Sequence, residues 1–420
     1  MARSPDPEAF LNSLEPIGWK LGLERMHRLL TVLGMPQHRF ASIHVVGTNG
    51  KSSVTRMTAA LLEAHGLSAG ACVSPHTSRW SERTLVHGEE LGEAEFATAL
   101  ARVEQAVASV NRGLAEGESV TQFEAATAVG FLALAMARVK VGVIEAGLGG
   151  RLDATNTIPS RVTVLTSIGL DHTQWLGDTE AEIAAEKLAV LRDNSILVLG
   201  RVSPEVGALA EETAAARGAR LVRAPEDPGD GLRLRAAGRF QRRNFALAIS
   251  AAEAFLGELD PTAVTAVAEG LTIPGRLELI AGHPPVFIDA AHNPDGARAL
   301  AEALPEVAGG PVVGCLAVLR DKDAGAMVAA LAPALERAVC TELPPRALGA
   351  QGRPGAESLP AAELARACSA AGLEAEAVGG LPEALSHARE LAAGLDGGAL
   401  LVSGSHYLLS PARAALGERS

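Results

Sequence analysis

The stretch that decides the fold is residues 42–64, which read SIHVVGTNGKSSVTRMTAALLEA. Residues 42–46 predict a strand, the glycine-containing residues 47–53 predict a loop, and residues 54–64 have the apolar spacing of a helix that ends before Gly66. In such a unit the loop N–H groups and the helix N-terminus bind phosphate, a lysine adds positive charge, and a serine hydroxyl can face Mg²⁺. The predicted phosphate site comprises Gly47, Thr48, Asn49, Gly50, Lys51, Ser52 and Ser53.

This loop is shorter than the general GxxxxGKS/T pattern, because Val45 stands where the first glycine would be. A glycine-rich turn with a solvated lysine therefore stays open as the alternative. The strand before the loop and the helix after it favour the phosphate site.

Strand-like runs recur along the chain, with Ala/Leu-rich segments between them. This alternation predicts an α/β protein with parallel sheets and helices on both faces. The length of 420 residues fits two domains, and the Gly/Pro-rich segment 271–285 separates two groups of strands. We therefore predict domains at residues 1–276 and 277–420. The expected strands are 42–46, 141–145, 161–167, 196–200, 286–290, 311–319, 338–341 and 399–403.

Composition excludes several classes of protein. The 37 Lys and Arg against 49 Asp and Glu give a net charge of −12, which disfavours a nucleic-acid-binding surface. The four cysteines show no CxxC pair, so neither a zinc site nor a disulfide framework is indicated. The first ten residues lack the apolar segment of a signal peptide, and the longest apolar stretch, 125–137, is short for a membrane span. We expect a cytoplasmic protein without nucleic-acid or membrane partners.

Ionisable residues follow two of the predicted strands. Glu145 ends strand 141–145, where a parallel sheet places its ligand crevice, although it could instead cap the next turn. A glycine-rich turn then leads to Asp153, which suits close approach of a ligand. His172 follows strand 161–167, but a lone histidine is more often structural than a metal ligand.

Lys187 is in an unusual position for a charged residue. Thr179 and Glu182 form a capping box, so a helix should begin there and continue to about Leu191. Ile183, Lys187 and Leu191 then share one face at i, i+4 and i+8, which puts a lysine on the apolar stripe. A buried ammonium is costly, so periodicity alone favours a snorkelling or ion-paired lysine.

Many short motifs occur in one order and spacing along the chain. They are LGLER (21–25), HVVGTNGK (44–51), SPH (74–76), SER (81–83), FEA (123–125), EAGLGGRLDATN (145–156), GLDH (169–172), AEK (185–187), PGRLE (274–278), DAAHNP (289–294) and DKD (321–323). Together they resemble the bifunctional bacterial folylpolyglutamate synthase/dihydrofolate synthase family of the Mur ligase superfamily. The resemblance spans nearly the whole chain.

This resemblance implies a P-loop ATPase-like N-terminal domain, a smaller Rossmann-like C-terminal domain, and a monomer. It implies a ligase that uses ATP to add L-glutamate to dihydropteroate or to the γ-carboxylate of reduced folates. The route is an acyl phosphate, with release of ADP and phosphate. The implied cofactors are Mg²⁺ at two sites, a carbamate formed by CO₂ on Lys187, and a monovalent cation as an optional addition.

The resemblance also assigns residues to these tasks. For ATP it adds three residues to the phosphate loop: Asn244, Arg276 and Asp289. The implied metal ligands are Ser74, Glu145, His172 and Lys187. The implied catalytic residues are Lys51, Asp153, His172, Lys187 and His292. The implied substrate contacts are Leu21, Gly22, Leu23, Arg83, Phe123, Glu124, Arg151, Leu152 and Asp153.

Two positions depart from the family pattern. The usual loop reads GTNGKGS, whereas Ser52 here replaces the glycine after the lysine. Thr77 stands where an aliphatic residue usually follows the SPH motif, which affects the substrate loop. The alternatives are a P-loop nucleotide-binding paralogue without catalysis and a Mur-type ligase with another carboxylate substrate. A cell-wall Mur ligase would carry an extra domain before the loop, and only 46 residues precede Gly47.

Overall fold

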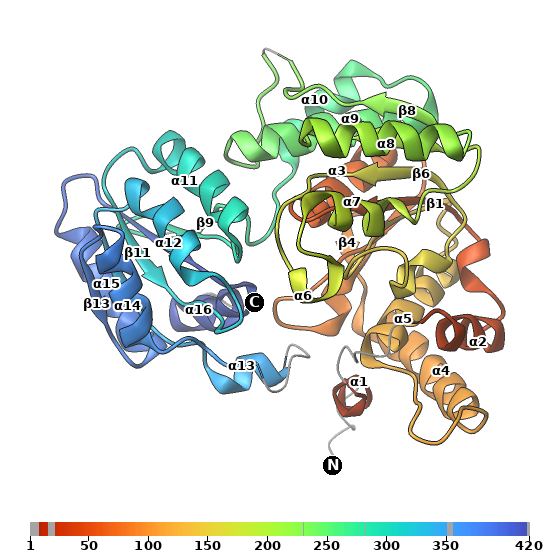
Figure 1. Cartoon of the computed structure of the whole chain (residues 1–420), viewed down its shortest axis with the longest axis horizontal. Coiled ribbons are helices and arrows are strands. Elements are labelled where there is room, and N and C mark those ends of the chain that lie inside the picture. The colour runs from red at the N-terminus through yellow and green to blue at the C-terminus, as the bar shows by residue number, and fades with distance from the viewer. Residues whose placement is uncertain (1–7, 16–21, 230, 281, 351–355, 418–420) are drawn as a thin grey trace. The chain divides into compact units, whose positions relative to one another are not determined.

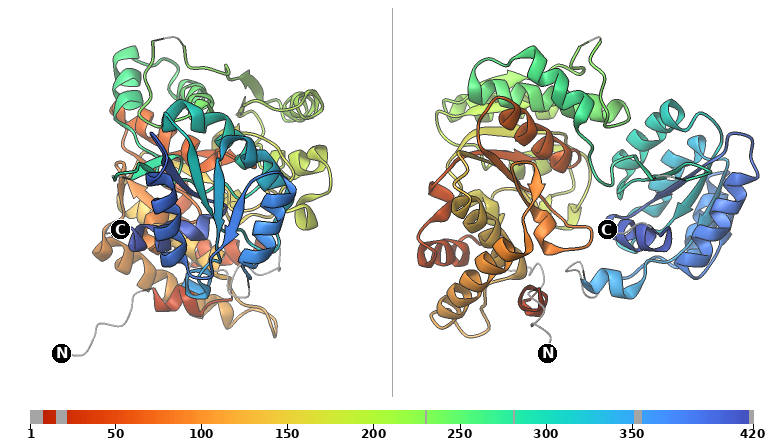
Figure 2. Two further views of the ribbon diagram at one scale, coloured as in Figure 1. Left: turned by 90° about the vertical axis from the view of Figure 1, so that its left-hand side faces the viewer. Right: turned by 180° about the vertical axis from the view of Figure 1, so that it is seen from behind.

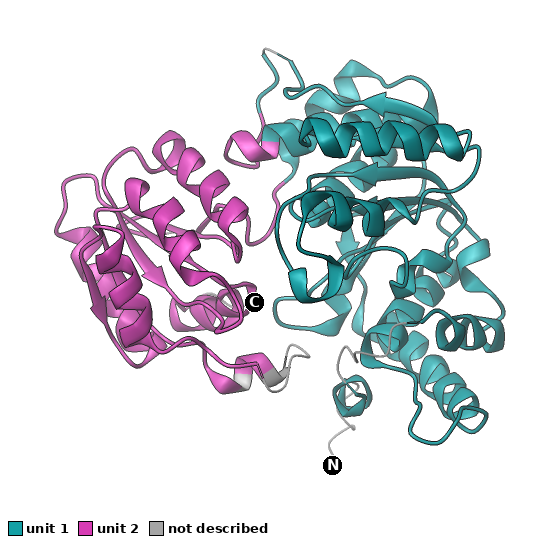
Figure 3. Ribbon diagram, viewed as in Figure 1, with its two compact units in different colours: residues 1–233, 242–271 teal, residues 234–241, 272–420 magenta. Residues whose placement is uncertain are grey.

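The computed structural model describes residues 8–15, 22–229, 231–280, 282–350 and 356–417, and the chain divides into two compact units (Figure 3). Unit 1 comprises residues 1–233 and 242–271, and unit 2 comprises residues 234–241 and 272–420. The sequence-based boundary at residue 276 thus lies inside unit 2. Residues 234–241 group with unit 2 because Ala237 and Phe240 pack against its core.

Unit 1 contains an eight-stranded sheet in the order β4-β3-β2-β5-β1-β6-β7-β8 (Figure 1). The six strands from β2 to β8 in this order are parallel, and only β3 and β4 pair antiparallel. The strands are β1 (Ala41–Val46), β2 (Ala69–Cys72), β3 (Thr84–Val86), β4 (Glu89–Glu90), β5 (Val141–Glu145), β6 (Ser160–Leu165), β7 (Ile196–Leu199) and β8 (Arg220–Arg223).

The helices that precede, connect or follow these strands are mostly those expected of crossover connections in a parallel sheet. They are α1 (Ala9–Ser13), α2 (Glu24–Val32), α3 (Lys51–Ala64), α4 (Glu93–Asn111), α5 (Gln122–Met136), α6 (Thr173–Leu176), α7 (Glu180–Leu188), α8 (Pro204–Ala216), α9 (Arg239–Leu256) and α10 (Pro261–Gly270). Short helices η1 (Pro36–His38), η2 (Trp80–Arg83) and η3 (Ala154–Thr157) lie in the loops.

Helix α5 is buried almost all round, because it packs between the sheet and helices α2 and α4. Two neighbouring strands make room for it with glycine. A Cβ on Gly70 would come within 2.4 Å of one Leu134 methyl carbon, and a Cβ on Gly142 within 3.2 Å of the other. Small residues in β2 and β5 therefore let the large side chains of α5 approach the sheet closely.

Unit 2 contains a six-stranded sheet in the order β13-β12-β11-β14-β10-β9, parallel except for β9. Two separate apolar clusters cover it, one with α11, α12 and α14 and one with α15 and α16, so helices lie on both faces (Figure 2). The elements are β9 (Glu278–Ile280), β10 (Val286–Ile288), α11 (Pro294–Ala308), β11 (Val312–Leu316), α12 (Ala324–Leu331), η4 (Ala332–Ala334), β12 (Arg337–Cys340), α13 (Pro345–Ala350), α14 (Ala361–Ala370), β13 (Ala375–Ala377), α15 (Leu381–Ala393), β14 (Ala399–Ser403), η5 (His406–Leu408) and α16 (Leu409–Ala415).

The structure confirms the α/β class and all eight predicted strands. Six further strands escaped the sequence analysis because they are short or lie at or near sheet edges, where a continuous apolar run is not required. They are β2, β3, β4, β8, β9 and β13. No helix among the residues that the structure describes combines the length and apolar character needed to cross a membrane.

A buried ion pair ties α2 to the first turn of α5. Arg25 approaches Glu124 at 3.2 Å through both Nε and a terminal nitrogen, and both side chains are less than one-tenth exposed. Glu124 also accepts the Thr121 backbone N–H at 2.8 Å as half of a capping box. Both carboxylate oxygens are therefore engaged in holding the fold.

We expect Arg25→Met to lower the free energy of unfolding by about 3–5 kcal/mol, because it leaves the Glu124 carboxylate buried and unpaired. The double variant Arg25→Met/Glu124→Gln should recover part of this loss. Urea unfolding followed by tryptophan fluorescence measures both, and an exposed-site change, Val32→Ala, serves as the control. A loss in Arg25→Met no larger than in Val32→Ala would contradict the assigned role of the pair.

Candidate functional site

The carboxyl ends of four neighbouring strands of unit 1 carry the residues that the sequence analysis singled out. Strands β2, β5, β1 and β6 lie side by side and parallel. Ser74 follows β2, Glu145 ends β5, the phosphate loop follows β1, and residues 166–172 follow β6. Carboxyl ends of parallel strands meet at one edge of the sheet, which is where such sheets bind ligands.

The phosphate loop runs from the end of β1 into α3. Gly47 has φ of 149°, and a Cβ there would lie 1.9 Å from the Thr166 hydroxyl. Gly50 has φ of 83° and precedes Lys51, the first residue of α3. The Lys51 ammonium donates to the Gly47 and Thr48 carbonyls, each at 3.0 Å. Glycine is needed at both positions, and the lysine lies over the loop as a phosphate-binding lysine requires.

The segment after β6 fixes the conformation of this loop. Thr48 donates its backbone N–H to the Ser167 carbonyl at 2.7 Å, and the Thr166 hydroxyl donates to the Asn49 carbonyl at 2.6 Å. Helix α9 also approaches the loop: a Cβ added to Gly50 would lie only 2.6 Å from the side-chain oxygen of Asn244. Asn244 therefore lies beside the loop within unit 1, at a position from which it can contact a nucleotide.

Glu145 joins three of the converging segments. Its carboxylate accepts the Ser52 hydroxyl at 2.9 Å and the Ser74 backbone N–H at 2.9 Å, and Glu145 itself is only 4% exposed. Ser53 lies beside Ser52 in the first turn of α3 with its hydroxyl buried. Carboxylate and hydroxyl oxygens at the end of a phosphate loop suit Mg²⁺, which uses few protein ligands and completes its shell with phosphate and water oxygens. The donor set thus fits the predicted metal.

Among the residues that the structure describes, no three His, Cys, Asp or Glu side chains gather as a metal cage. His172 follows β6 with φ of 53°, and its backbone N–H donates to the Asp171 carboxylate at 2.9 Å. Histidine adopts this left-handed backbone conformation more readily than most residues do.

Lys187 is buried, as its place on the apolar stripe predicts. It is 4% exposed in α7, whose capping box of Thr179 and Glu182 is present. Burial, and next to it the nearby Lys51 charge, lower the pKa of Lys187 to about 7, although the charges of Asp153, Asp171 and Glu186 oppose the change. Its burial argues against a snorkelling lysine, whereas Asp153, Asp171 and Glu186 lie close enough to act on its charge.

The glycine-rich turn after β5 packs against the helix that carries Lys187. A Cβ on Gly150 would lie 2.8 Å from the Glu186 carbonyl and 3.0 Å from the Lys187 Cα. Asp153, only 6% exposed, accepts the backbone N–H groups of Leu148 at 2.8 Å and Thr155 at 3.0 Å, and burial raises its pKa. The turn thus brings Asp153 and Lys187 into one charged group with Lys51.

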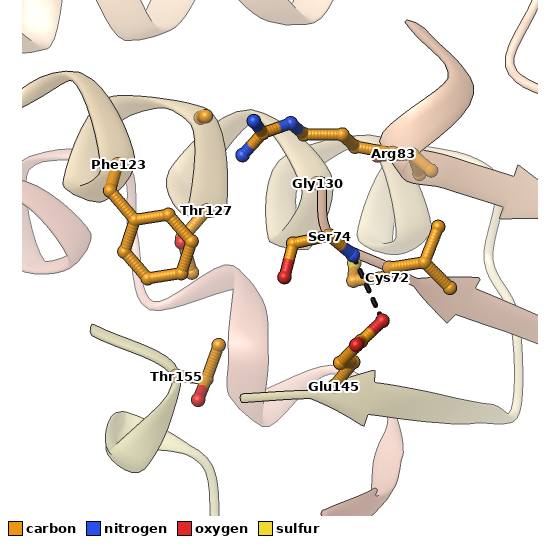
Figure 4. Close-up of a pocket in the computed structure, with 11 residues that line it drawn as sticks. Cys72, Ser74, Arg83, Phe123, Thr127, Gly130, Glu145 and Thr155 are labelled. Atoms are coloured by element: carbon orange, nitrogen blue, oxygen red, sulfur yellow. Dashed lines mark hydrogen bonds between the residues drawn. The ribbon is translucent and has the colours of Figure 1, made fainter. Parts of the chain in front are cut away.

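A small hollow of about 30 Å³ lies beside Glu145 (Figure 4). Figure 4 shows the Arg83 side chain extending over it, with the Phe123 ring and Thr155 on the opposite side. Phe123 packs over the glycine turn, because a Cβ on Gly147 would lie 2.3 Å from its ring. The hollow is lined by Cys72, Val73, Ser74, Arg83, Thr84, Phe123, Ala126, Thr127, Gly130, Glu145 and Thr155.

Three of the predicted site residues lie in unit 2: Arg276 precedes β9, and Asp289 and His292 follow β10. The Asp289 carboxylate accepts the backbone N–H groups of Leu277 at 2.7 Å and Ala291 at 2.8 Å; burial raises its pKa, while the Arg276 charge opposes the rise. The His292 Nδ1 pairs with the Ala290 carbonyl at 2.9 Å. Within unit 2, Arg276, Asp289 and His292 thus gather around the β9–β10 pair.

The remaining predicted substrate contacts vary in their surroundings. Leu21 lies outside the described residues. Gly22 and Leu23 immediately precede α2, and Leu152 is 38% exposed. Arg151 forms an ion pair with Glu186 at 3.1 Å.

Sequence reasoning did not single out several residues at this site. The Thr155 hydroxyl donates to the Asp153 carboxylate. The same hydroxyl also pairs with Nε2 of the fully buried His44 at 2.8 Å. Burial lowers the pKa of His44 to about 3, so it is neutral. His76 and Trp80 are also buried beside Arg83. His44, His76 and Thr155 stand inside motifs quoted above and Trp80 immediately precedes one, but nothing in those motifs indicated a role for these four residues.

Comparison with known proteins agrees with this geometry. The Mur ligase glutamate ligase domain matches residues 275–406. The dihydrofolate synthase/folylpolyglutamate synthase of Mycobacterium tuberculosis is 36% identical over 366 residues, covering 78% of this chain and 75% of the relative. Folylpolyglutamate synthase of M. tuberculosis complexed with ADP superposes with a TM-score of 0.88 at 32% identity, covering 98% of each chain.

A bifunctional folylpolyglutamate synthase/dihydrofolate synthase with Mn, AMPPNP and L-glutamate bound superposes with a TM-score of 0.83 at 30% identity, covering 99% of each chain. In these comparisons the sequence identity is 30% or more, and the aligned residues cover most of this chain and most of each relative. The chain therefore belongs to the dihydrofolate synthase/folylpolyglutamate synthase family.

Proposed function

We propose that this protein is an ATP-dependent ligase that adds L-glutamate to dihydropteroate or to the γ-carboxylate of reduced folates. The observation that carries the proposal is the meeting of the phosphate loop, Glu145 and the buried Lys187 at one edge of the unit 1 sheet. Family membership supplies the reaction class, and the solved relatives bind ADP, AMPPNP, Mn and L-glutamate.

The reaction must activate a carboxylate, whose leaving group would otherwise be oxide. Transfer of the ATP γ-phosphoryl group to the carboxylate gives an acyl phosphate and ADP. The amine of glutamate then attacks the acyl carbon, phosphate leaves with the C–O bond electrons, and the amine loses a proton. The first step brings together two anions, so positive charge at the site decides its rate.

The residues of unit 1 meet this requirement in separate ways. The loop N–H groups and the α3 N-terminus cradle the phosphates, and Lys51 adds a positive charge. Glu145 and Ser74 would hold a divalent metal, which supplies charge to the phosphates when it is bound. Arg83 and Phe123, which the resemblance assigns to the pterin substrate, line the small hollow beside Glu145. Within unit 2, the resemblance assigns Arg276 and Asp289 to ATP and His292 to the glutamate side of the reaction.

A carbamate on Lys187 explains why the family site buries a lysine. A neutral amine attacks CO₂ to give an N-carboxylate and one proton, so carbamylation needs the deprotonated lysine that a pKa near 7 provides. The product is an anion with two oxygens suited to a second Mg²⁺ beside His172. The monovalent cation, the monomeric state and the cytoplasmic location stay predictions.

ADP release should depend on L-glutamate together with dihydropteroate or tetrahydrofolate. A coupled assay for ADP measures it, with each substrate omitted in turn as the control. The two pterin acceptors tested separately show whether both synthase activities are present. ATP binding without any pterin-dependent release would instead support the non-catalytic paralogue, and turnover with a different carboxylate would support another Mur-type ligase.

Glu145→Gln should weaken binding of Mn²⁺, used as a spectroscopic probe, by about tenfold or more, because an amide is a poorer ligand than a carboxylate. Electron paramagnetic resonance of Mn²⁺ in the presence of a non-hydrolysable ATP analogue measures the affinity. Glu63→Gln makes the same charge change at the far end of α3, where Glu63 accepts the Ala69 N–H, and should bind Mn²⁺ normally. Equal affinity in both variants would remove Glu145 from the metal site.

Lys187→Ala should abolish most activity while leaving the far-ultraviolet circular dichroism unchanged. In the unaltered protein, ¹³CO₂ should produce a carbamate signal in ¹³C nuclear magnetic resonance. Because Lys187 has its pKa near 7, the signal should grow from pH 6 to pH 8, as the ammonium loses its proton, and fade as the pH falls. Near-normal turnover in Lys187→Ala, or a signal that persists in that variant, would refute the carbamate.

A further inference from the structure

Two of the four cysteines lie together inside unit 2. The Sγ atoms of Cys340 and Cys368 are 3.7 Å apart and share a hydrogen bond. Both side chains are fully buried, and both belong to the apolar cluster that covers one face of the unit 2 sheet. Because the two residues are 28 positions apart in the chain, no short cysteine spacing indicates this contact.

The other two cysteines are placed differently. Cys315 lies in β11 and belongs to the apolar cluster on the opposite face of the same sheet. Cys72 ends β2 in unit 1. Among the residues that the structure describes, Cys340 and Cys368 are therefore the two cysteines whose sulfur atoms are in contact.

Each cysteine of the pair lies near an end of its element. Cys340 is the last residue of β12, and Cys368 lies in the last turn of α14. Helix α14 packs against β12 and against β13, which is the edge strand of the sheet. Because helix ends open more readily than helix centres, opening of the last turn of α14 gives a small reagent access to Cys368.

The two sulfurs need only a small movement to bond. A disulfide has an S–S length of about 2.05 Å, so the atoms must approach by roughly 1.7 Å. The hydrogen bond from Cys340 lowers the pKa of Cys368, although burial opposes the change, and the same contact raises the pKa of Cys340. Cys368 is therefore the thiol of the pair that forms the reactive thiolate more readily.

We propose that Cys340 and Cys368 form an oxidation site, at which a peroxide converts the two thiols into a disulfide that joins β12 to α14. In the first step the Cys368 thiolate attacks one peroxide oxygen and the O–O bond breaks. The departing hydroxide takes up a proton, which gives water and a sulfenic acid on Cys368. The Cys340 sulfur then attacks the Cys368 sulfur, the S–O bond breaks, and the leaving hydroxide takes the Cys340 thiol proton to form a second water. The two thiols lose two electrons, and hydrogen peroxide gains them.

The disulfide would close a loop that runs from β12 to the last turn of α14. Part of this loop is already attached to the segment after β11, because the Leu359 backbone N–H donates to the Val318 carbonyl at 2.8 Å and the Arg320 backbone N–H donates to the Glu357 carbonyl at 2.9 Å. Closing such a loop restricts the unfolded chain, so oxidation should stabilise unit 2. The inference does not depend on the proposed ligase reaction, since neither cysteine is among the proposed site residues.

Treatment of the reduced full-length protein with hydrogen peroxide, without denaturant, tests the site. Thiol titration after unfolding should fall from four thiols to two, and the intact mass should fall by the mass of two hydrogens. Mass spectrometry of a proteolytic digest should find Cys340 linked to Cys368, and a dithiol reductant should restore all four thiols. The Tm should be higher by roughly 5 °C or more after oxidation.

Three variants assign the response to this pair. Cys368→Ala leaves Cys340 without a partner, so it should form no internal disulfide and show no rise in Tm. Cys340→Ala makes the same test from the strand, and it decides the point if Cys368→Ala does not fold. Cys315→Ala is the matched control, because it removes a fully buried cysteine from the other face of the same sheet. Its three thiols should fall to one, and the rise in Tm should remain.

Several results would overturn the inference. They are four titratable thiols after peroxide treatment, a disulfide to Cys72 or Cys315 or between two molecules, and a sulfinic acid on Cys368 without a disulfide. A Cys340–Cys368 disulfide that forms only when denaturant unfolds the chain would also overturn it, because the folded protein would then give the peroxide no access. A disulfide that forms in the folded protein and leaves the Tm unchanged would refute its stabilising effect.

Discussion

The contact on which the site depends is the carboxylate of Glu145 bridging the Ser52 hydroxyl and the Ser74 backbone N–H. It joins the end of β5, the first turn of α3 and the segment after β2, so three chain segments far apart in sequence are held together. A carboxylate that is 4% exposed needs such donors. These contacts hold the site together before any nucleotide binds.

Ser52 gives this contact a feature specific to the chain. In a loop with glycine at that position the hydroxyl would be missing, and the carboxylate would lose one of its donors. Because Ser52 is the second residue of α3, it needs no left-handed backbone, and the side chain is accommodated without strain. The departure from the GTNGKGS pattern is therefore compatible with the loop, and it adds an oxygen at the metal end of the site.

The sequence predicts those parts of the protein that depend on interactions between residues close together in the chain. The β1–loop–α3 unit, the capping box at Thr179 and the buried Lys187 follow from glycine placement, capping chemistry and periodicity. Contacts between distant segments do not follow in the same way. The Arg25–Glu124 pair spans 99 residues, and no local pattern distinguishes Glu124 as an ion-pair partner from Glu124 as a substrate contact.

A protein with a net charge of −12 can bind anionic substrates because its positive charges are concentrated at the site. Many of the acidic side chains are on the surface, whereas Lys51, Arg83 and Lys187 are grouped with a few buried or partly buried acids near one sheet edge. In that low-dielectric region a single charge acts strongly on its neighbours, as the effect of Lys51 on Lys187 illustrates. Carbamylation would convert Lys187 from a cation into an anion. The repulsion between Lys51 and Lys187 would then become an attraction between opposite charges. The same change would create an anion that only a metal or Lys51 can neutralise. If Lys187 is carbamylated as proposed, the burial of this one lysine would couple CO₂, metal and nucleotide binding at the same edge of the sheet.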